Sequence, residues 1–499
     1  MQDPQLTLLM VPSLAVASLP LMQALHASGA EVIYDPLTGQ TALATRLDGL
    51  RDLADFSTLP ARRTRRIAIL PAQSLYGLEL PESAEGSVLI RLDTLDPARM
   101  VIRALRIEAW VLAGRAEGID RPLPIPQSAA FRPDLDPQRF RTMIHEINIG
   151  RAMLDAALPK GIKRADWGDA ASLPAEILPD LALTEPVSEP AEDLASLIGN
   201  AAALTELIRE ERIACPGIEP PPLPGPRLDP TRRPHLIGFV CGRNVAPYLP
   251  VLAARMYDED VPLVYIDNDS NDGSAEIAQE LRGKGILSVG NLPYAGSFSV
   301  EQQLKDKARL VHEYEPEWIM NIDADEIIEC RDTGRGLHDM VSDAEARGYN
   351  AINLNEFVFL PECGENHSGR DYYAEMGSYY FFEPMPYRLL RLWRHSMGMS
   401  NLGDAGHRLT GPVRIAPESH NLRHYMALSQ QAAIDKYVGR VFSSDELARN
   451  WHSNRTNITL DKIHLPRPGS PFVKKLANPG SRNLIRSHPA DGHWWNWPQ

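Results

Sequence analysis

The chain has 499 residues, of which 43% are hydrophobic and 23% are charged, as in ordinary globular proteins. This length exceeds what one hydrophobic core supports and predicts two or three domains. The formal net charge of −14 argues against general nucleic-acid binding, which needs an electropositive face, but leaves room for a local basic patch. Four cysteines without a CxxC pair exclude a disulfide framework and indicate a reducing, cytoplasmic location.

The first apolar stretch of the chain is interpreted as part of a folded domain. A signal peptide would begin with basic residues, whereas the only early charge is Asp3. Pro12 and Pro20 interrupt a membrane-spanning helix, so we predict a strand at Leu6–Val11 and a helix at Leu19–Ala27. We therefore expect a soluble protein without a transmembrane segment. Such a protein can still contact a membrane-bound acceptor from the cytosolic side.

A proline-rich stretch at residues 214–234 divides the sequence, with eight prolines in 21 residues. Such a composition favours extended polyproline geometry and predicts a semi-rigid linker. Residues 1–213 alternate strand-like and helical runs, which predicts an α/β domain with a helical end, and they carry no catalytic motif. The further elements predicted there are strands at Arg66–Leu70, Ser87–Leu92 and Trp110–Ala113 and helices at Gln138–Ala157 and Ala191–Arg212.

Residues 235–499 are predicted to form a second α/β domain that ends in a C-terminal tail. Strands and helices alternate here at a spacing that implies a mostly parallel sheet, in which ligands bind beyond the carboxyl ends of the strands. Polar clusters follow three of the strands, at Cys241–Asn244, Asp267–Asp272 and Asp323–Glu326, and we expect them to converge. The predicted strands are Leu236–Val240, Leu263–Asp267, Ile286–Val289 and Trp318–Ile322, and the predicted helices are Tyr248–Tyr257, Ser274–Arg282 and Ser299–Tyr314.

Asp323 and Asp325 form a DxD pattern directly after a buried strand. Two carboxylates held together repel each other unless a cation lies between them, and hard oxygen ligands suit Mg²⁺ or Mn²⁺. A divalent ion there would stabilise the charge that develops on a departing nucleoside diphosphate. The alternative is a solvated acidic turn without a ligand.

The acidic segment Asp267–Gly273 does not match a calcium-binding EF-hand. That motif requires Gly at its sixth position and Glu at its twelfth, where this chain has Asp272 and Ala278. A strand-end turn in which Asp267 or Asp269 binds a nucleotide base and ribose is the favoured interpretation. A helix N-cap turn with Asp272 or Ser274 as the capping residue is the alternative, and different residues can serve both roles.

Three basic residues further along the chain complete the candidate site. A neutral His424 can complete a metal's coordination, and Lys436 and Arg440, four residues apart on a predicted helix, can bind a diphosphate. The alternative is a solvated helix face and a hydrogen-bonded surface histidine.

Taken together and in this order, the clusters resemble the family 2 glycosyltransferases, especially a bacterial subgroup. The likeness covers about residues 235–455, and the chain departs from it at Val245, where the family commonly has Glu. The motifs that carry the resemblance are Arg243-Asn244-Val245, Asp267–Gly273, Asp323–Glu326, Gly406-His407, Arg423-His424-Tyr425 with Ser429 and Lys436, and Trp451-His452.

The resemblance implies a Rossmann-like GT-A fold, a nucleotide-sugar donor, a glycan or glycoconjugate acceptor and Mn²⁺ or Mg²⁺. It also implies inversion of the anomeric centre by direct displacement, with a carboxylate that deprotonates the acceptor hydroxyl. The implied metal ligands are Asp323, Asp325 and His424. The implied nucleotide-sugar contacts are Asn244, Asp267, Asp269, Asp323 and Lys436.

The base is expected between the metal motif and His424. Asp404 is the first candidate and Glu365 the second, while Glu356, Glu362 and Asp371 stay open as alternatives. Each is also consistent with an exposed loop carboxylate. Aromatic residues of the same region are candidates for stacking on an acceptor sugar, or for strand packing in a core. They are Tyr372, Tyr373, Tyr379, Tyr380, Phe381, Phe382 and Trp393.

Two other functions compete with a sugar transferase. A nucleotidyltransferase usually has a basic, glycine-rich loop after its first strand, and the segment Cys241–Asn244 is too short and too poor in glycine for one. A non-catalytic carbohydrate-binding or scaffold protein would carry a decayed centre, whereas Asp323 and Asp325 are intact.

Overall fold

A computed structural model describes the molecule, and the chain divides into two compact units, Met1–Pro222 and Leu223–Gln499. The predicted α/β class is confirmed. The predicted helix at Leu19–Ala27 and the linker at 214–234 lie largely outside the described residues, and the predicted domain boundaries stay predictions. The described residues are 5–13, 21, 24–25, 31–34, 65–72, 87–116, 131–158, 162–167, 178, 181, 183, 193–210, 213–218, 236–395, 398–402, 404–449, 451 and 455–497.

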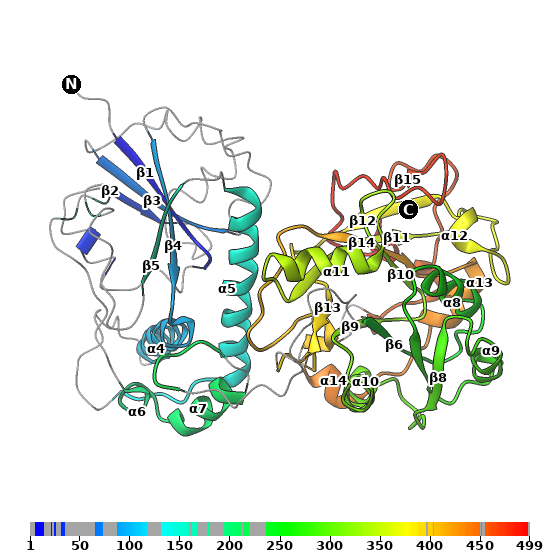
Figure 1. The fold of residues 1–499 in the computed structure, drawn as a ribbon, viewed down its shortest axis with the longest axis horizontal. Coiled ribbons are helices and arrows are strands. Elements are labelled where there is room, and N and C mark those ends of the chain that lie inside the picture. The colour runs from blue at the N-terminus through cyan, green and yellow to red at the C-terminus, as the bar shows by residue number, and fades with distance from the viewer. Residues whose placement is uncertain are drawn as a thin grey trace. The chain divides into compact units, whose positions relative to one another are not determined.

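The N-terminal unit contains a sheet of parallel strands in the order β2-β3-β1-β4-β5, with the long helix α5 beside it (Figure 1). Apolar side chains of the strands and helices form one core. The elements are β1 (Gln5–Val11), β2 (Glu31–Tyr34), β3 (Arg65–Pro71), β4 (Ser87–Thr94), α4 (Pro97–Ala116), α5 (Pro137–Ala157), β5 (Lys163–Trp167), α6 (Leu194–Leu197) and α7 (Ala201–Glu210).

Two predictions for this unit are wrong in detail. Trp110–Ala113 is not a strand, because it belongs to α4, a helix of 20 residues whose first turn is capped by Asp96 through a 3.0 Å bond from the Arg99 amide. A short apolar run cannot be told from a helix segment by periodicity alone. The single helix predicted at Ala191–Arg212 is two helices, separated at Gly199-Asn200.

The C-terminal unit contains a larger, mixed sheet in the order β10-β14-β11-β13-β9-β6-β7-β8. Strands β8, β7, β6 and β9 are mutually parallel, and β13 joins β9 and β11 in antiparallel pairing. Strands β12 and β15 extend from β11. This is the Rossmann-like, largely parallel arrangement that the sequence predicts.

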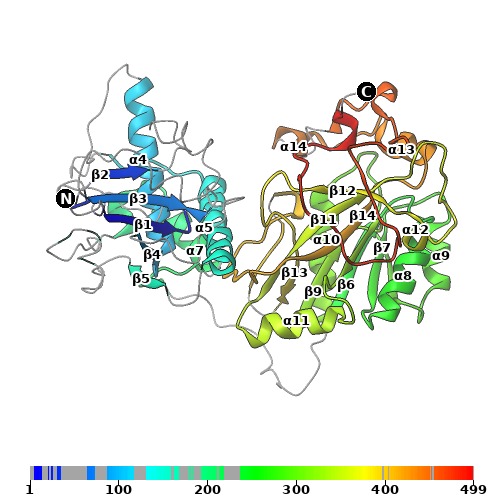
Figure 2. The same ribbon diagram turned by 90° about the horizontal axis from the view of Figure 1, so that it is seen from above.

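Helices α8 and α9 lie together beside the β6–β8 part of this sheet (Figure 2). The predicted strands and helices between Leu236 and Ile322 are confirmed, and Ser299 caps α10 by accepting a 3.2 Å bond from the Gln302 amide. The first elements are β6 (Leu236–Gly242), α8 (Leu249–Asp258), β7 (Leu263–Asp267), α9 (Ser274–Glu280), β8 (Ile286–Asn291), α10 (Val300–Tyr314) and β9 (Trp318–Ile322).

The later elements bring distant segments back to the first strands. Strand β14 pairs with β10 and β11, and helix α13 follows it directly. These elements are β10 (Glu326–Glu329), α11 (Leu337–Ala346), β11 (Ala351–Phe359), α12 (Tyr372–Glu375), β12 (Ser378–Phe382), β13 (Leu390–Arg394), a 3₁₀ turn at Asp404–Gly406, β14 (His420–Tyr425), α13 (Gln430–Tyr437), α14 (Ser444–Ala448), 3₁₀ turns at Leu460–Lys462 and Trp494–Asn496, and β15 (Lys474–Lys475).

Most of the aromatic residues considered for acceptor stacking are core residues. Tyr372, Tyr379 and Phe381 are buried among the apolar side chains of the sheet, and Trp393 is also buried. Phe382 is the member of this set that also lines the pocket described below. Within the described residues, every helix is too short or too polar to span a bilayer.

Candidate active site

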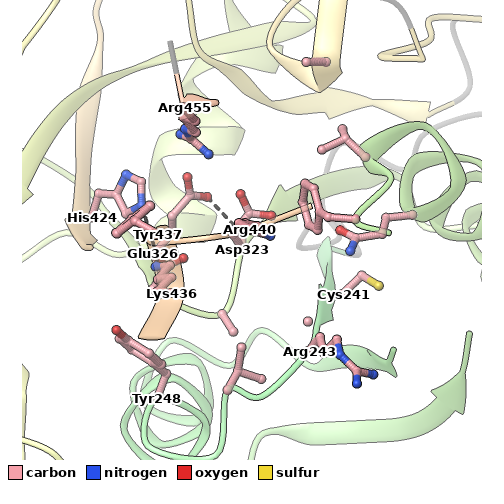
Figure 3. A pocket seen from close by; sticks show the side chains of 18 of the residues that line it. Cys241, Arg243, Tyr248, Asp323, Glu326, His424, Lys436, Tyr437, Arg440 and Arg455 are labelled. Carbon is pink, nitrogen blue, oxygen red and sulfur yellow. Dashed lines mark hydrogen bonds and ion pairs between the residues drawn. The ribbon is translucent and has the colours of Figure 1, made fainter. Parts of the chain in front are cut away.

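The C-terminal unit has a pocket of about 900 Å³ where strands β6 and β9 end (Figure 3). Its wall includes Cys241–Asn244 after β6 and Asp323–Glu326 after β9, so two of the three predicted clusters converge there completely, and the third reaches the pocket with Asp272 alone. The C-terminal half of the chain supplies the rest of the wall. Those residues include Glu356, Arg388, Arg391, His407, His424, Lys436, Arg440, Trp451, Arg455 and His493.

The DxD residues lie in the turn between β9 and β10. The Asp323 amide donates a 3.0 Å bond to Oε2 of Glu326, and the Glu326 amide donates a 3.1 Å bond to the Asp323 carbonyl. The Asp325 carbonyl accepts a 2.8 Å bond from the Tyr425 amide, which ties the turn to β14. The turn is therefore held rigidly, while the Asp323 side chain stays 46% exposed towards the pocket.

Buried cations balance the charge of this turn. Arg391 contacts Asp323 at 3.3 Å and Glu326 at 3.1 Å, and the Lys307 ammonium lies 3.8 Å from Asp323. Burial raises the pKa of Asp323, but Arg391 and Lys307 outweigh it and leave this pKa below its ordinary value. Burial also raises the pKa of Glu326, and there the effect of burial prevails over Arg391. Asp323 is thus kept ionised.

His424 lies between two carboxylates. Its Nε2 is 3.2 Å from Oδ2 of Asp325, and its Nδ1 is 2.6 Å from Oε1 of Glu356. Burial lowers the pKa of His424, but Asp325 and Glu326 together raise it more, so the net shift is upward. Glu356 also pairs with Arg388. The carboxylate of Glu356 therefore orients the ring of His424 so that Nε2 faces Asp325.

Lys436, on the helix α13 that follows β14, forms an ion pair with Asp325. Ser429 caps α13 by accepting a 3.1 Å bond from the Ala432 amide, and Lys436 lies in the last turn of this helix. Burial opposes ionisation of both partners, but their mutual attraction prevails. The pKa of Asp325 is therefore lowered and that of Lys436 raised.

The residues present suit a divalent ion by their chemistry. Asp323 and Asp325 offer hard oxygen donors, and His424 offers an imidazole whose second nitrogen already contacts a carboxylate, as is usual for metal-binding histidines. In the described part of the chain, no three His, Cys, Asp or Glu side chains are spaced to share one ion. An ion would have to displace the Lys436 ammonium from Asp325.

Asn244 lines the pocket, whereas Asp267 and Asp269 do not. Asp267 accepts bonds from the Tyr265 hydroxyl at 3.0 Å and the Ser270 amide at 2.8 Å. Asp269 accepts a 2.7 Å bond from the Tyr294 amide. The carboxylates thus satisfy backbone and side-chain donors of neighbouring segments.

Asp272 is the member of the acidic segment that lines the pocket. Its carboxylate accepts 3.0 Å bonds from the amides of Ala246 and Ser274. It joins the turn after β6 to the first amide of α9, but the N-cap residue of this helix is Gly273 and has no side-chain cap bond, so neither Asp272 nor Ser274 is the N-cap residue.

The five base candidates lie in different surroundings. Glu356 lines the pocket, whereas Glu365 does not and instead contacts His367 at 3.3 Å. Glu362 is buried against Ser378 and Lys475, and Asp371 caps α12. The backbone of Asp404 belongs to the 3₁₀ turn beside the pocket residues Ala405 and His407, and its side chain lies outside the description.

Several pocket residues were not predicted from the sequence. Lys307 had a signal, because it follows Leu304 and precedes Leu310 and Val311 on the buried face of an amphipathic helix. A lysine on such a face needs a buried partner. No sequence signal marks Arg391, because it lies in a buried part of strand β13 that no motif identifies. Arg388, Arg455 and His493 also lacked a motif.

Comparisons with solved structures find partial likeness to two proteins, one of them in two structures. S. aureus TarS matches with 15% identity over 32% of this chain and 28% of that chain, at a TM-score of 0.22. A TarS structure in complex with UDP matches with 11% identity over 46% and 76%, at a TM-score of 0.26. The mannosyltransferase PcManGT from Pyrobaculum calidifontis, in complex with GDP-Man and Mn²⁺, matches with 20% identity over 27% and 39%, at a TM-score of 0.21.

The chain covers between 28% and 47% of the length of the first three matched structures. At these TM-scores the likeness supports no residue-level comparison, so the fold class rests on the strand order given above. No protein-family model and no curated protein matches the sequence.

Proposed function

We propose that the C-terminal unit is an inverting glycosyltransferase of family 2 type. It moves a sugar, as a hexosyltransferase does, from a nucleotide-sugar donor to a glycan or glycoconjugate acceptor. The observation that carries this proposal is the convergence of Asn244, Asp323, Asp325, His424 and Lys436 on one pocket beyond the ends of parallel strands. Ligands of α/β sheets bind in such crevices.

The proposed donor site joins a carboxylate side and a cationic side. Asp323, Asp325 and His424 would hold Mn²⁺ or Mg²⁺, which stabilises negative charge on a departing diphosphate. Lys436 neutralises Asp325 in the structure and would contact the diphosphate once an ion takes its place. Asn244 would contact the nucleotide, because it follows β6 and faces the same pocket. Asp267 and Asp269 stay proposed nucleoside contacts that require a rearranged turn.

The test of this function is a donor screen on the full chain. Thermal unfolding would be followed with UDP- and GDP-sugars, each with Mn²⁺, with Mg²⁺ and with a chelator. A donor that binds the folded state at about 100 times its Kd stabilises it by about 2.7 kcal/mol. We expect one donor class to raise the unfolding temperature in a metal-dependent way and to release nucleoside diphosphate slowly. A panel in which no donor binds or turns over with metal present contradicts the proposal.

We propose Asp404 as the catalytic base, with Glu365 second. Asp404 is favoured because Ala405 and His407 beside it line the pocket, whereas Glu365 contacts His367 away from it. Asp404→Asn is expected to reduce nucleoside diphosphate release about 10²- to 10⁴-fold, because general-base catalysis contributes about that much. Donor binding should persist in this variant. Release at the wild-type rate would exclude Asp404, and Glu365→Gln is the matched comparison.

A further inference from the structure

The C-terminal segment carries His493 into the wall of the pocket. Residue Ala490 pairs with Phe382 of β12, and Trp494 and Trp495 are buried in the core next to this strand. These contacts fix the segment on both sides of His493. The histidine is 6% exposed, stacks on the Phe382 ring at 4.0 Å and places Nδ1 3.1 Å from the Tyr380 hydroxyl. Among the described residues, no hydrogen-bond partner faces its Nε2, which leaves this nitrogen for a ligand.

The charged groups that act most strongly on His493 are basic. Arg455, His424, Arg388 and His407 line the same pocket and, after burial, are the main causes that hold the pKa of His493 well below its ordinary value. A neutral imidazole can donate one hydrogen bond, and the arginines supply positive charge beside it. This part of the wall therefore combines fixed cations with a buried donor.

Arg455 and Arg440 have no carboxylate at ion-pair distance within the described residues. Arg440 stacks on Phe298 at 3.8 Å, and burial together with the nearby Arg455 lowers the pKa of Arg440 to about 10. Both side chains face the pocket (Figure 3). The chain as a whole has a net charge of −14, so two uncompensated guanidinium groups in one pocket are a local exception. Such a concentration of positive charge attracts anions.

The cations of the pocket separate into two sets. Lys307, Arg391 and Lys436 pair with the carboxylates of the DxD turn and stand at the proposed metal and diphosphate site. Arg455 and His493 line the same pocket but form no ion pair with a carboxylate of that turn within the described residues. One bound diphosphate would occupy the first set together with Arg440. It would leave Arg455 and His493 without an anion.

We propose that Arg455 and His493 form a second anion subsite, which binds a phosphate or carboxylate group of the acceptor. The acceptor of this enzyme is therefore an anionic glycan or glycoconjugate. The assignment of this anion to an acceptor rests on the proposed transferase function, whereas anion binding by Arg455 and His493 does not. Guanidinium groups suit both anions, because their paired N–H donors match two oxygens.

The experiment measures anion binding by calorimetry on the full chain. Glycerol 1-phosphate and glucuronate serve as probes, first alone and then with saturating UDP or GDP and Mn²⁺. We expect one or both probes to bind with the nucleotide present. Arg455→Met should weaken probe binding about tenfold or more, which is the size expected for one lost charge-assisted contact. The affinity for the nucleotide should change by about twofold or less, because Arg455 is placed outside the diphosphate site.

Two further variants serve as controls. Arg467→Met removes an exposed arginine and should leave probe binding unchanged. His493→Gln keeps a neutral donor and should retain most of the binding, whereas His493→Ala should lose it. If either histidine variant unfolds at a lower temperature, the Arg455→Met result alone decides.

Three results would overturn the proposal. The first is that the probes do not bind the wild type, and the second is that they bind Arg455→Met equally well. The third is that the nucleotide displaces them competitively, which would assign Arg455 to the diphosphate. A second arm compares UDP-glucuronate with UDP-glucose. If Arg455→Met weakens only the acidic donor, the anion belongs to the donor sugar and the acceptor assignment is wrong. If no nucleotide binds but the probes still depend on Arg455, the transferase function fails while the subsite stands.

Discussion

The two units both bury charged side chains near a parallel sheet, but they complete these networks differently. In the N-terminal unit, Arg91 pairs with Asp93 at 3.3 Å and with Asp155, and Arg151 pairs with Asp93 at 2.7 Å. Two cations thus meet two carboxylates, and Arg151 also donates a 2.6 Å bond to the Thr94 carbonyl. This network is complete within the protein.

The network in the C-terminal unit opens on a pocket. Asp323 keeps part of its carboxylate exposed, although Arg391 and Lys307 hold it ionised. Arg440 and Arg455 reach the same pocket and pair with no carboxylate of the described residues. Buried charge is costly unless it is paired. A closed network is therefore explained by stability, whereas an open one indicates that a charged ligand completes it.

The variant Asp325→Asn tests the open network and has the largest expected effect. It removes the charge that Lys436 and His424 share, and with it one proposed metal ligand. We expect nucleoside diphosphate release to fall about 10³-fold, in line with the loss of one strong electrostatic contact in an active site. The free energy of unfolding should fall by at most about 3 kcal/mol, because Lys436 loses its charge partner but stays 27% exposed, and the domain should remain folded.

The control for this experiment is Asp306→Asn. Asp306 is partly buried, pairs with Arg309 on α10 and does not line the pocket. It should leave both activity and stability unchanged. An Asp325→Asn protein with wild-type release would remove the metal role of Asp325, and one that fails to fold would place Asp325 among the structural charges.

The sequence predicts those parts of the site that depend on local order. Strand ends in an alternating α/β pattern must meet at one edge, which is why Asn244, Asp323 and Asp325 could be placed together before the structure was known. His424 and Lys436 were found through their motif. The structure brings these five residues to one pocket.

Tertiary pairing explains what the sequence does not predict. Arg391 reaches Asp323 only because β13 inserts antiparallel next to β9, and no local pattern specifies that neighbour. Asp267 and Asp269 were expected at a ligand, but backbone amides nearby compete for their carboxylates. Acidic side chains in turns often bond the local backbone. His493 lies 69 residues beyond His424, and only the fold brings them together.

The variant Asp93→Asn tests the closed network of the N-terminal unit, and its effect should be on stability alone. It removes the negative charge that Arg91 and Arg151 share in this buried network. We expect a loss of about 3 kcal/mol in the free energy of unfolding, the lower end for a broken buried ion pair, because Arg151 is partly exposed. Calorimetric unfolding of the full chain measures this loss. Asp136→Asn is the matched control, since asparagine caps α5 as well as aspartate does. Donor binding by the C-terminal unit should be unchanged in both variants. A loss of donor binding in Asp93→Asn, with the C-terminal unit still folded, would show that the charges of the two units are not separate in function.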